Sequence, residues 1–198
     1  MTNTKEELSS SSFHVLLTGQ IDQAIDFPSG CYCRYVLSYG DDWTVVNGVT
    51  SSITQLSYSQ ANGTIVWNFP LELTFRSTNA YGWPRISFGI YGKDFLGRDV
   101  VRGYGSVLIP TVQGRHEVIV EMYRPVSGNC CHEMLNFFKG TVPEYYETAF
   151  TARNQGREVT RVRCAGKLKL ILETTMKDMD KFGFGTSVTP TSNSKKTR

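Results

Sequence analysis

The chain has 198 residues, of which 40% are hydrophobic and 20% are charged, so it is long and apolar enough for one folded domain with a single core. Its formal net charge is +3, but Lys195, Lys196 and Arg198 lie in a terminal stretch without acidic residues, and the rest of the chain is formally neutral. A neutral body excludes a general nucleic-acid binder, because such proteins carry a basic excess within the fold.

The cysteines and the N-terminal sequence indicate a reducing compartment. The five cysteines include one vicinal pair and one Cys-x-Cys, and this odd set does not resemble a disulfide framework. Met1 to Ser12 is polar and lacks the apolar core of a signal peptide. No run approaches the roughly 18–20 apolar residues of a membrane-spanning helix. We therefore expect a cytoplasmic protein.

Alternation of apolar and polar residues predicts a series of short strands. The first starts at Phe13, where Val15 and Leu17 alternate with more polar neighbours. A stretch from Thr64 to Arg76 is predicted to be two strands interrupted at Pro70, because proline lacks the N–H that a ladder needs. The other predicted strands are Tyr32–Tyr39, Ile53–Tyr58, Arg85–Tyr91, Tyr104–Ile109, His116–Tyr123, Glu158–Cys164 and Lys167–Thr175. With Gly or Pro in nearly every gap, the pattern predicts an all-β, antiparallel sandwich of about eight strands.

Two further segments are predicted to contain short helices. The stretch between Pro125 and Gly156 is too long for a plain loop, and its apolar spacing favours a helix over Cys130–Lys139. A second short helix is predicted over Met176–Phe182. We expect a disordered N-terminal segment over 1–12, one domain over 13–183, and a disordered basic tail over 184–198.

The sequence offers no catalytic motif. His14 and His116 are interpreted as solvated strand residues, and no nucleophile elbow, phosphate loop or dinucleotide fingerprint is present. We therefore predict no enzyme and no cofactor.

Zinc is an alternative use for the cysteines. Cys31 and Cys33, with the run Cys130-Cys131-His132, supply enough soft ligands, but their spacing differs from that of a structural zinc knuckle. On a strand, Cys31 and Cys33 point to the same face, which favours core packing. We predict no metal site here.

Calcium has weak candidates only. The stretch from Ile90 to Asp99 resembles the third calcium loop of C2 domains, and Asp94 and Asp99 match its acidic positions. However, Gly92 occupies the first acidic position, and the opposing loop from Ser77 to Pro84 has no carboxylate. Calcium needs six to eight oxygen ligands. A turn closed by aspartate hydrogen bonds is the simpler interpretation.

A basic face is predicted near the C-terminus. Successive strand residues point to opposite faces, so leucines at even positions pack inward, together with Val162 and Cys164, and cations at odd positions point outward. If the two strands pair as a hairpin through Ala165-Gly166, these cations gather on one surface. It suits an acidic partner protein or a phosphoinositide headgroup, and an ordinary solvated face is the alternative. The candidate residues are Arg157, Arg161, Arg163, Lys167 and Lys169.

An ordered set of segments resembles the B9-domain family over about residues 13 to 183. The segments are Val66–Pro70, Thr74–Asn79, Tyr81–Pro84, Tyr91-Gly92, Asp99–Gly105, Pro143–Tyr145, Gly156–Arg163 and Thr175–Met179. Two of them are family-motif loops. For both, we favour a role in forming the fold over a role in partner contact. Gly82-Trp83-Pro84 is expected to form a tight loop in which Trp83 covers the sandwich end, and Gly103-Tyr104-Gly105 a bend before a strand. The loop residues are Tyr81, Gly82, Trp83, Pro84, Gly103, Tyr104 and Gly105.

The resemblance implies a C2-like sandwich that acts as a non-enzymatic scaffold at the ciliary transition zone. It implies other B9-domain proteins and tectonic-type membrane components as partners, within a Meckel-syndrome complex that gates the entry of ciliary membrane proteins. Such a complex bears on cilium assembly and hedgehog signalling, and the expected location is the cytoplasm, the cytoskeleton, the basal body and the transition zone. The alternative is a calcium-independent peripheral membrane module that binds phosphoinositides on an anionic membrane surface.

Overall fold

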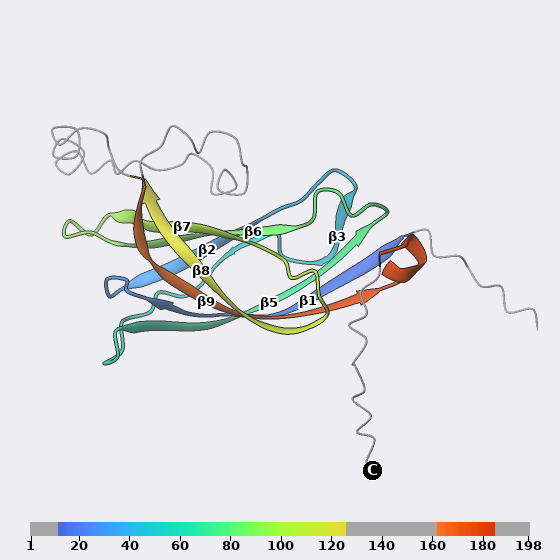
Figure 1. Cartoon of the computed structure of the whole chain (residues 1–198). Helices are drawn as coiled ribbons and strands as arrows, with labels where there is room; N and C mark the ends of the chain where they lie inside the picture. Colours follow the sequence, from blue (N-terminus) through green and yellow to red (C-terminus); the bar gives the residue numbers. More distant parts are fainter. Residues whose placement is uncertain (1–11, 126–161, 185–198) are drawn as a thin grey trace, which may run out of the picture.

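The computed structural model describes residues 12–125 and 162–184, and most of these residues belong to nine strands (Figure 1). A short 3-10 helix, η3 (Met179–Phe182), follows the last strand. No helix within the described ranges is long and apolar enough to cross a membrane. The strands are β1 (Phe13–Ile25), β2 (Cys31–Ser38), β3 (Trp43–Gly48), β4 (Ser51–Ile53), β5 (Thr64–Ser77), β6 (Arg85–Lys93), β7 (Asp99–Leu108), β8 (Gly114–Pro125) and β9 (Val162–Lys177).

The strands form two antiparallel layers. Their hydrogen-bonded order is β3-β5-β1-β9-β8-β7-β6-β2-β4, and β7 joins β8 through the single pair Tyr104–Tyr123. Because that connection is so short, the sheet folds there into two layers. One layer contains β3, β5, β1, β9 and β8, and the other contains β7, β6, β2 and β4 (Figure 1). The predicted all-β antiparallel sandwich is confirmed.

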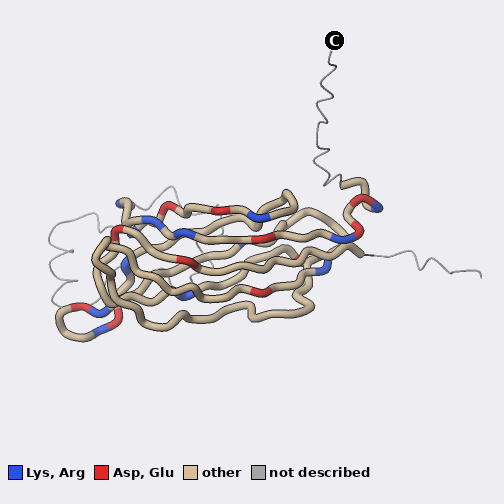
Figure 2. Tube along the Cα trace, turned by 90° about the horizontal axis from the view of Figure 1, so that it is seen from below, with Lys and Arg blue, Asp and Glu red and all other residues tan. Residues whose placement is uncertain are grey.

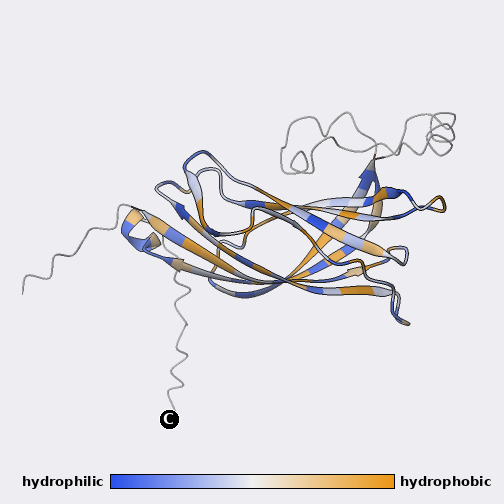
Figure 3. Cartoon of the chain, turned by 180° about the vertical axis from the view of Figure 1, so that it is seen from behind, coloured by the Kyte–Doolittle hydropathy of each residue, from blue (hydrophilic) through white to orange (hydrophobic). Residues whose placement is uncertain are grey.

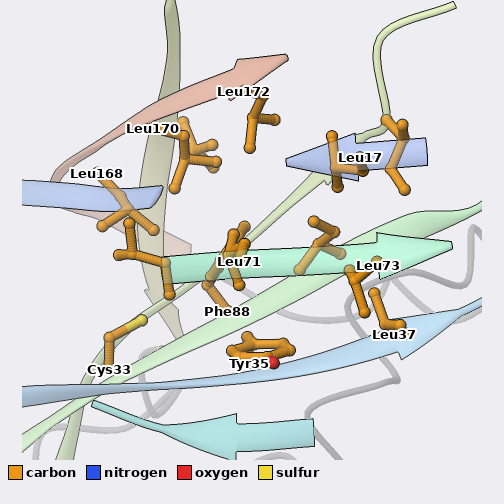
Figure 4. Close-up of a cluster of buried hydrophobic side chains, with 14 of the residues drawn as sticks. Leu17, Cys33, Tyr35, Leu37, Leu71, Leu73, Phe88, Leu168, Leu170 and Leu172 are labelled. Carbon is orange, nitrogen blue, oxygen red and sulfur yellow. The ribbon is translucent and has the colours of Figure 1, made fainter. Parts of the chain in front are cut away.

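The core lies between the layers. Leu170 and Leu71 approach it from one layer, and Tyr35 and Phe88 approach it from the other (Figure 4). Apolar and polar residues alternate along most strands, as the colouring by hydropathy shows (Figure 3). Each fully buried aliphatic or aromatic side chain stabilises the fold by about 1.5–3 kcal/mol relative to an exposed one.

The sequence allowed a hairpin through Ala165-Gly166, and this hairpin does not form. Residues from Val162 to Lys177 form the single strand β9, which pairs with β1 on one side and β8 on the other. Met122 pairs with Gly166 and Tyr123 with Cys164, so Ala165 has no opposite residue and forms a β-bulge. The prediction that even-numbered side chains pack inward therefore holds after the bulge, for Leu168, Leu170 and Leu172. It fails before the bulge, where Val162 and Cys164 are exposed.

Several element boundaries also differ from the prediction. Strand β3 was not predicted. Strand β4 ends at Ile53, where the predicted strand Ile53–Tyr58 begins. Strand β9 extends to Lys177, over part of the predicted helix Met176–Phe182. Strand β5 runs unbroken through Pro70. Strand β3 pairs with β5 only from Leu73 to Ser77, so one edge of β5 has no neighbouring described strand at Pro70. The N–H that proline lacks is therefore not needed for a hydrogen bond to a strand on that edge.

The predicted terminal segments and the predicted helix over Cys130–Lys139 lie almost wholly outside the described residues. Phe184, the first residue of the predicted tail, packs on Phe13 with ring centroids 5.9 Å apart.

Candidate functional site

The two lysines of the predicted basic face have acidic partners. Lys167 Nζ lies 3.0 Å from Glu121 Oε1, and Lys169 Nζ lies 3.2 Å from Glu117 Oε2 and 3.7 Å from Asp22 Oδ2. The hydrogen bond and charge of Glu121 raise the pKa of Lys167 above its ordinary value. Lys and Arg are interspersed with Asp and Glu along the strands (Figure 2). The lysines are therefore part of a mixed surface of both charges.

Arg163 has different surroundings from the lysines. It lies before the Ala165 bulge and directly opposite Arg124 of β8. Together with Arg102 of β7, these arginines line a hollow of about 220 Å³. The other two cations of the predicted face, Arg157 and Arg161, lie outside the described residues. The role of the whole set in partner or lipid binding stays a prediction.

Asp94 closes its own loop between β6 and β7. Its Oδ1 accepts hydrogen bonds from the backbone N–H groups of Leu96 and Arg98, each at 2.9 Å, and its Oδ2 pairs with the Arg98 guanidinium. Desolvation raises the pKa of Asp94, but these hydrogen bonds and the Arg98 charge outweigh it, so the pKa lies below its ordinary value. Asp99 pairs with Lys93 at 3.3 Å. Both oxygens of Asp94 and Oδ2 of Asp99 are thus engaged by the protein's own donors.

The cysteines are divided between the core and the surface. Cys31 and Cys33 are fully buried, and burial raises the pKa of both thiols, although the charge of Arg102 partly opposes this for Cys31. Cys164 is exposed. Cys130, Cys131 and His132 lie outside the described residues, and within the described part no three His, Cys, Asp or Glu side chains gather as metal ligands would.

Three exposed apolar residues lie on the two edge strands, β3 and β4, and on the connection between them. Val46, Val49 and Ile53 are 56%, 59% and 54% exposed. Val46 is the bulge residue of edge strand β3, because Val45 pairs with Phe75 and Asn47 with Thr74. Ile53 ends edge strand β4, and Val49 lies in the connection, where its carbonyl accepts a hydrogen bond from the Tyr35 hydroxyl at 3.0 Å. We call Val46, Val49 and Ile53 the edge row.

Comparison with known proteins identifies the family. A family model described as "Ciliary basal body-associated, B9 protein" matches residues 15–175. The chain belongs to the B9 family. It is 43% identical over 182 residues to B9 domain-containing protein 1 of Mus musculus, which covers 90% of this chain and 89% of the relative. The corresponding values for B9 domain-containing protein 1 of Homo sapiens are 42% over 187 residues, 92% and 91%.

More distant proteins also match the B9 chain. B9 domain-containing protein 2 of Xenopus laevis is 25% identical over 174 residues, which covers 87% of this chain and 98% of the relative. Among solved structures, a C2 domain of plant extended synaptotagmin 1 is 11% identical with a TM-score of 0.44, covering 81% of this chain and 93% of that domain.

The first B9 motif loop closes one end of the sandwich. Trp83 Nε1 donates to the Ile109 carbonyl at 2.9 Å, and the Pro84 carbonyl accepts from Ile109 N at 3.1 Å. Gly82 has a φ of +70°, and a Cβ there would lie 2.6 Å from Gly40 Cα. These contacts favour a structural role for all of the motif except Tyr81, whose side chain is highly exposed although its carbonyl accepts from Trp43 Nε1.

The second B9 motif, Gly103-Tyr104-Gly105, lies at the corner between the layers. It is inside β7 rather than before a strand, so the predicted bend is wrong in position. Tyr104 is fully buried and supplies the one pair between β7 and β8. A Cβ on Gly105 would collide with Met122 Sδ, and one on Gly103 would lie 3.2 Å from Phe27 and Ala165. The glycines therefore allow the two strands and their side chains to approach closely.

Sequence reasoning missed the edge row and the arginines Arg102 and Arg124. The edge row had a local signal in Val45-Val46, which follows Trp43-Thr44 as a short apolar strand pattern. Arg102 and Arg124 had none, because they meet Arg163 only through pairing between strands far apart in the chain.

Proposed function

We propose that this B9 protein is a non-enzymatic scaffold component of the ciliary transition zone that binds other B9-domain proteins. The family description and the relatives named B9 domain-containing proteins 1 and 2 support a ciliary role. In this role the protein joins a Meckel-syndrome complex with tectonic-type membrane components at the basal body and transition zone. The complex is needed for cilium assembly and hedgehog signalling and gates the entry of membrane proteins into the cilium.

The observation that carries this proposal is the edge row. Three large apolar side chains, each more than half exposed, stand close together in sequence on β3, β4 and the connection between them. Burying them in an interface is favourable by about 25 cal/mol per Å² of apolar area. The bulge at Val46 and the shortness of β4 leave little regular ladder for an added strand. The partner therefore packs on side chains rather than extending the sheet.

Co-purification with B9 domain-containing protein 2 of the same organism tests the proposal. Wild-type protein is expected to form a stable complex in size-exclusion chromatography. The double variant Val46→Asp/Ile53→Asp is expected to weaken it about tenfold or more, since a carboxylate buried in an apolar interface stays unpaired. Val112→Asp is the matched control, because Val112 is also an exposed valine but lies in the loop before β8.

The outcomes separate the function from its surface. If the wild-type protein forms no complex with any B9-domain partner, the scaffold role is wrong. If the complex forms and the edge variant and the Val112→Asp control bind equally well, the role stands and the edge row is not the interface. Circular dichroism of both variants excludes unfolding as the cause of a loss.

A further inference from the structure

Three arginines converge at the end of the sandwich where β7 begins and β8 ends. Tyr104 of β7 pairs with Tyr123 of β8, so Arg102 and Arg124 extend from that pair toward the same end. Arg163 lies opposite Arg124. The hollow of about 220 Å³ between them has room for a polyatomic group, since one water takes about 30 Å³. Its walls include Arg102, Arg124, Arg163, Phe27, Pro28 and Cys164, and we call it the arginine pocket.

Two β-bulges build this pocket. Ile90 pairs with Gly103 and Tyr91 with Val101, so Arg102 itself is the extra residue of a bulge in β7. Ala165 is the extra residue of the bulge in β9, next to Arg163 and Cys164. A bulge bends its strand and re-aims a side chain, and bulges are frequent at binding sites. The second bulge depends on Gly166, where φ is +130° and a Cβ would lie 2.6 Å from the Ile25 carbonyl oxygen.

The pocket carries positive charge that the described residues do not neutralise. Among the described residues, no carboxylate lines the pocket and none of its three arginines forms an ion pair. Directly opposed like charges are unfavourable, as for Arg124 and Arg163. Lys167 and Lys169, a few residues farther along β9, each face an acidic partner instead. The contrast indicates a site prepared for an anion.

Arg102 also has an unused donor. Its Nη2 donates to the Lys93 carbonyl at 2.7 Å, which fixes the guanidinium. Its Nε is buried and has no hydrogen-bond partner among the described residues. A buried donor without an acceptor is unfavourable, and this one lies 3.4 Å from the position that a Cβ on Gly92 would take.

A second feature at the same end is apolar. The loop between β6 and β7 exposes Phe95 by 69% and Leu96 by 58%. Arg102 bonds to the carbonyl of Lys93, where this loop begins, so the loop and the pocket are directly connected. The beginning of β7 and the end of β8 lie at one end of the sandwich (Figure 1). Exposed apolar tips beside cations suit a membrane surface with anionic headgroups.

We propose that the arginine pocket binds a phosphate monoester of a phosphoinositide headgroup while Phe95 and Leu96 enter the membrane interface. Guanidinium groups match phosphate oxygens in bidentate geometry and remain charged at all physiological pH values. Phe27 and Pro28 supply an apolar wall for ring carbons of the headgroup. This function is additional to partner binding through the edge row, and it needs no calcium.

Vesicle flotation and calorimetry test the proposal on the full chain. The vesicles contain phosphatidylcholine with either a bisphosphorylated phosphoinositide or phosphatidylserine at equal total charge, and the soluble probe is inositol trisphosphate. The wild-type protein is expected to bind the phosphoinositide vesicles and the soluble probe in preference to phosphatidylserine. Arg124→Gln/Arg163→Gln should weaken both by about tenfold or more, because charge-assisted hydrogen bonds to phosphate are lost.

Lys167→Gln/Lys169→Gln is the matched control, since it removes the same charge from the same region outside the pocket. It should change binding less than threefold or so if a defined pocket rather than general attraction is responsible. A third variant, Phe95→Ser/Leu96→Ser, should lose vesicle binding and keep the soluble probe. Cys164 gives an independent readout, because it is exposed in the pocket wall and bound probe should slow its alkylation.

The contrary outcomes are distinct. Equal losses in the arginine and lysine variants would mean general attraction and no pocket. Binding of inositol trisphosphate without vesicle binding, or tighter binding of a phosphoserine peptide, would overturn the membrane assignment. Absence of binding to every probe overturns the proposal. None of these results depends on complex formation with B9 domain-containing protein 2, so the scaffold role is judged separately.

Discussion

Trp43 and Trp83 meet edge to face, with ring centroids 5.0 Å apart and an interplanar angle of 77°. Trp43 begins β3 in one layer, and Trp83 lies in the loop that leads to β6 in the other. Both indole N–H groups donate to backbone carbonyls, at 2.8 Å for Trp43 and 2.9 Å for Trp83. This pair therefore joins the two layers at the end of the sandwich remote from the arginine pocket.

Replacement of Trp83 should reveal that junction. Trp83→Ala is expected to lower the free energy of unfolding by about 3 kcal/mol, because it leaves a cavity beside Trp43 and orphans the Ile109 carbonyl. Trp83→Phe keeps a ring and should lose only about 1–2 kcal/mol, mainly the hydrogen bond. Urea denaturation followed by circular dichroism measures both. Equal stability of the alanine variant and the wild type would contradict this account.

Gly82 supports the same junction through the backbone. Gly82→Ala should be destabilising for two reasons, a φ of +70° and a Cβ that would lie 2.6 Å from Gly40 Cα. Gly63→Ala is the control, because Gly63 has a φ of +79° but no atom within 4 Å of the added Cβ. The control should lose about 1–2 kcal/mol from the left-handed backbone alone. Gly82→Ala must lose more in the same denaturation experiment, or the close approach of the two glycines has no energetic role.

Period-two alternation predicted most strands but could not locate the bulges. Leu168, Leu170 and Leu172 face the core as the alternation requires. Val162 follows the same parity and is exposed, because the bulge at Ala165 shifts the strand by one residue. That bulge is set by pairing with β8 and by the conformation of Gly166, and neither is visible in a local pattern. The sandwich was therefore predictable from the sequence. Which side chains of β9 point toward the core before Leu168 was not.

The same distinction between local and distant contacts decides which interactions of the candidate site could be predicted from the sequence. The turn closed by Asp94 was predictable, since its hydrogen bonds reach only Leu96 and Arg98. The neutralisation of Lys167 was not, because Glu121 lies on a separate strand whose register the sequence does not reveal.

Acidification should weaken the β6–β7 loop through Asp94. Its folded-state pKa lies below the ordinary value of 3.8, so its stabilising contribution is complete above that pH. The contribution is lost as the pH falls through the lower folded-state pKa. Asp94→Asn removes the charge that binds Arg98 and should lower the melting temperature near neutral pH. The difference between wild type and variant should shrink as the pH falls below about 3.8.

Thermal denaturation at a series of pH values measures this difference. Asp180→Asn is a useful control, because Asp180 is an exposed aspartate for which no ion pair is seen in the described part of the chain. A gap between wild type and Asp94→Asn that widened in acid would have the wrong sign for a lowered pKa. The loop would then be held by contacts other than the aspartate.

The described cysteines should differ in reactivity by position. Alkylation requires a thiolate and access, and burial both raises the pKa of Cys33 and removes it from solvent. Cys31 is buried as well, and its raised pKa also keeps it protonated. Cys164 is exposed, so iodoacetamide at mildly alkaline pH should modify Cys164 first. Peptide mass spectrometry assigns each modified residue.

Denaturant provides the control for this prediction. In the unfolded chain the three thiols lose their different environments and should react at similar rates, because each then has an ordinary cysteine pKa. In the native protein, Cys33 should react only as fast as the sandwich opens, so a destabilising change such as Trp83→Ala should accelerate Cys33 while leaving Cys164 nearly unchanged. Modification of Cys33 in the native protein as fast as Cys164 would mean that the Cys33 thiol is exposed in solution, which contradicts its burial in the core.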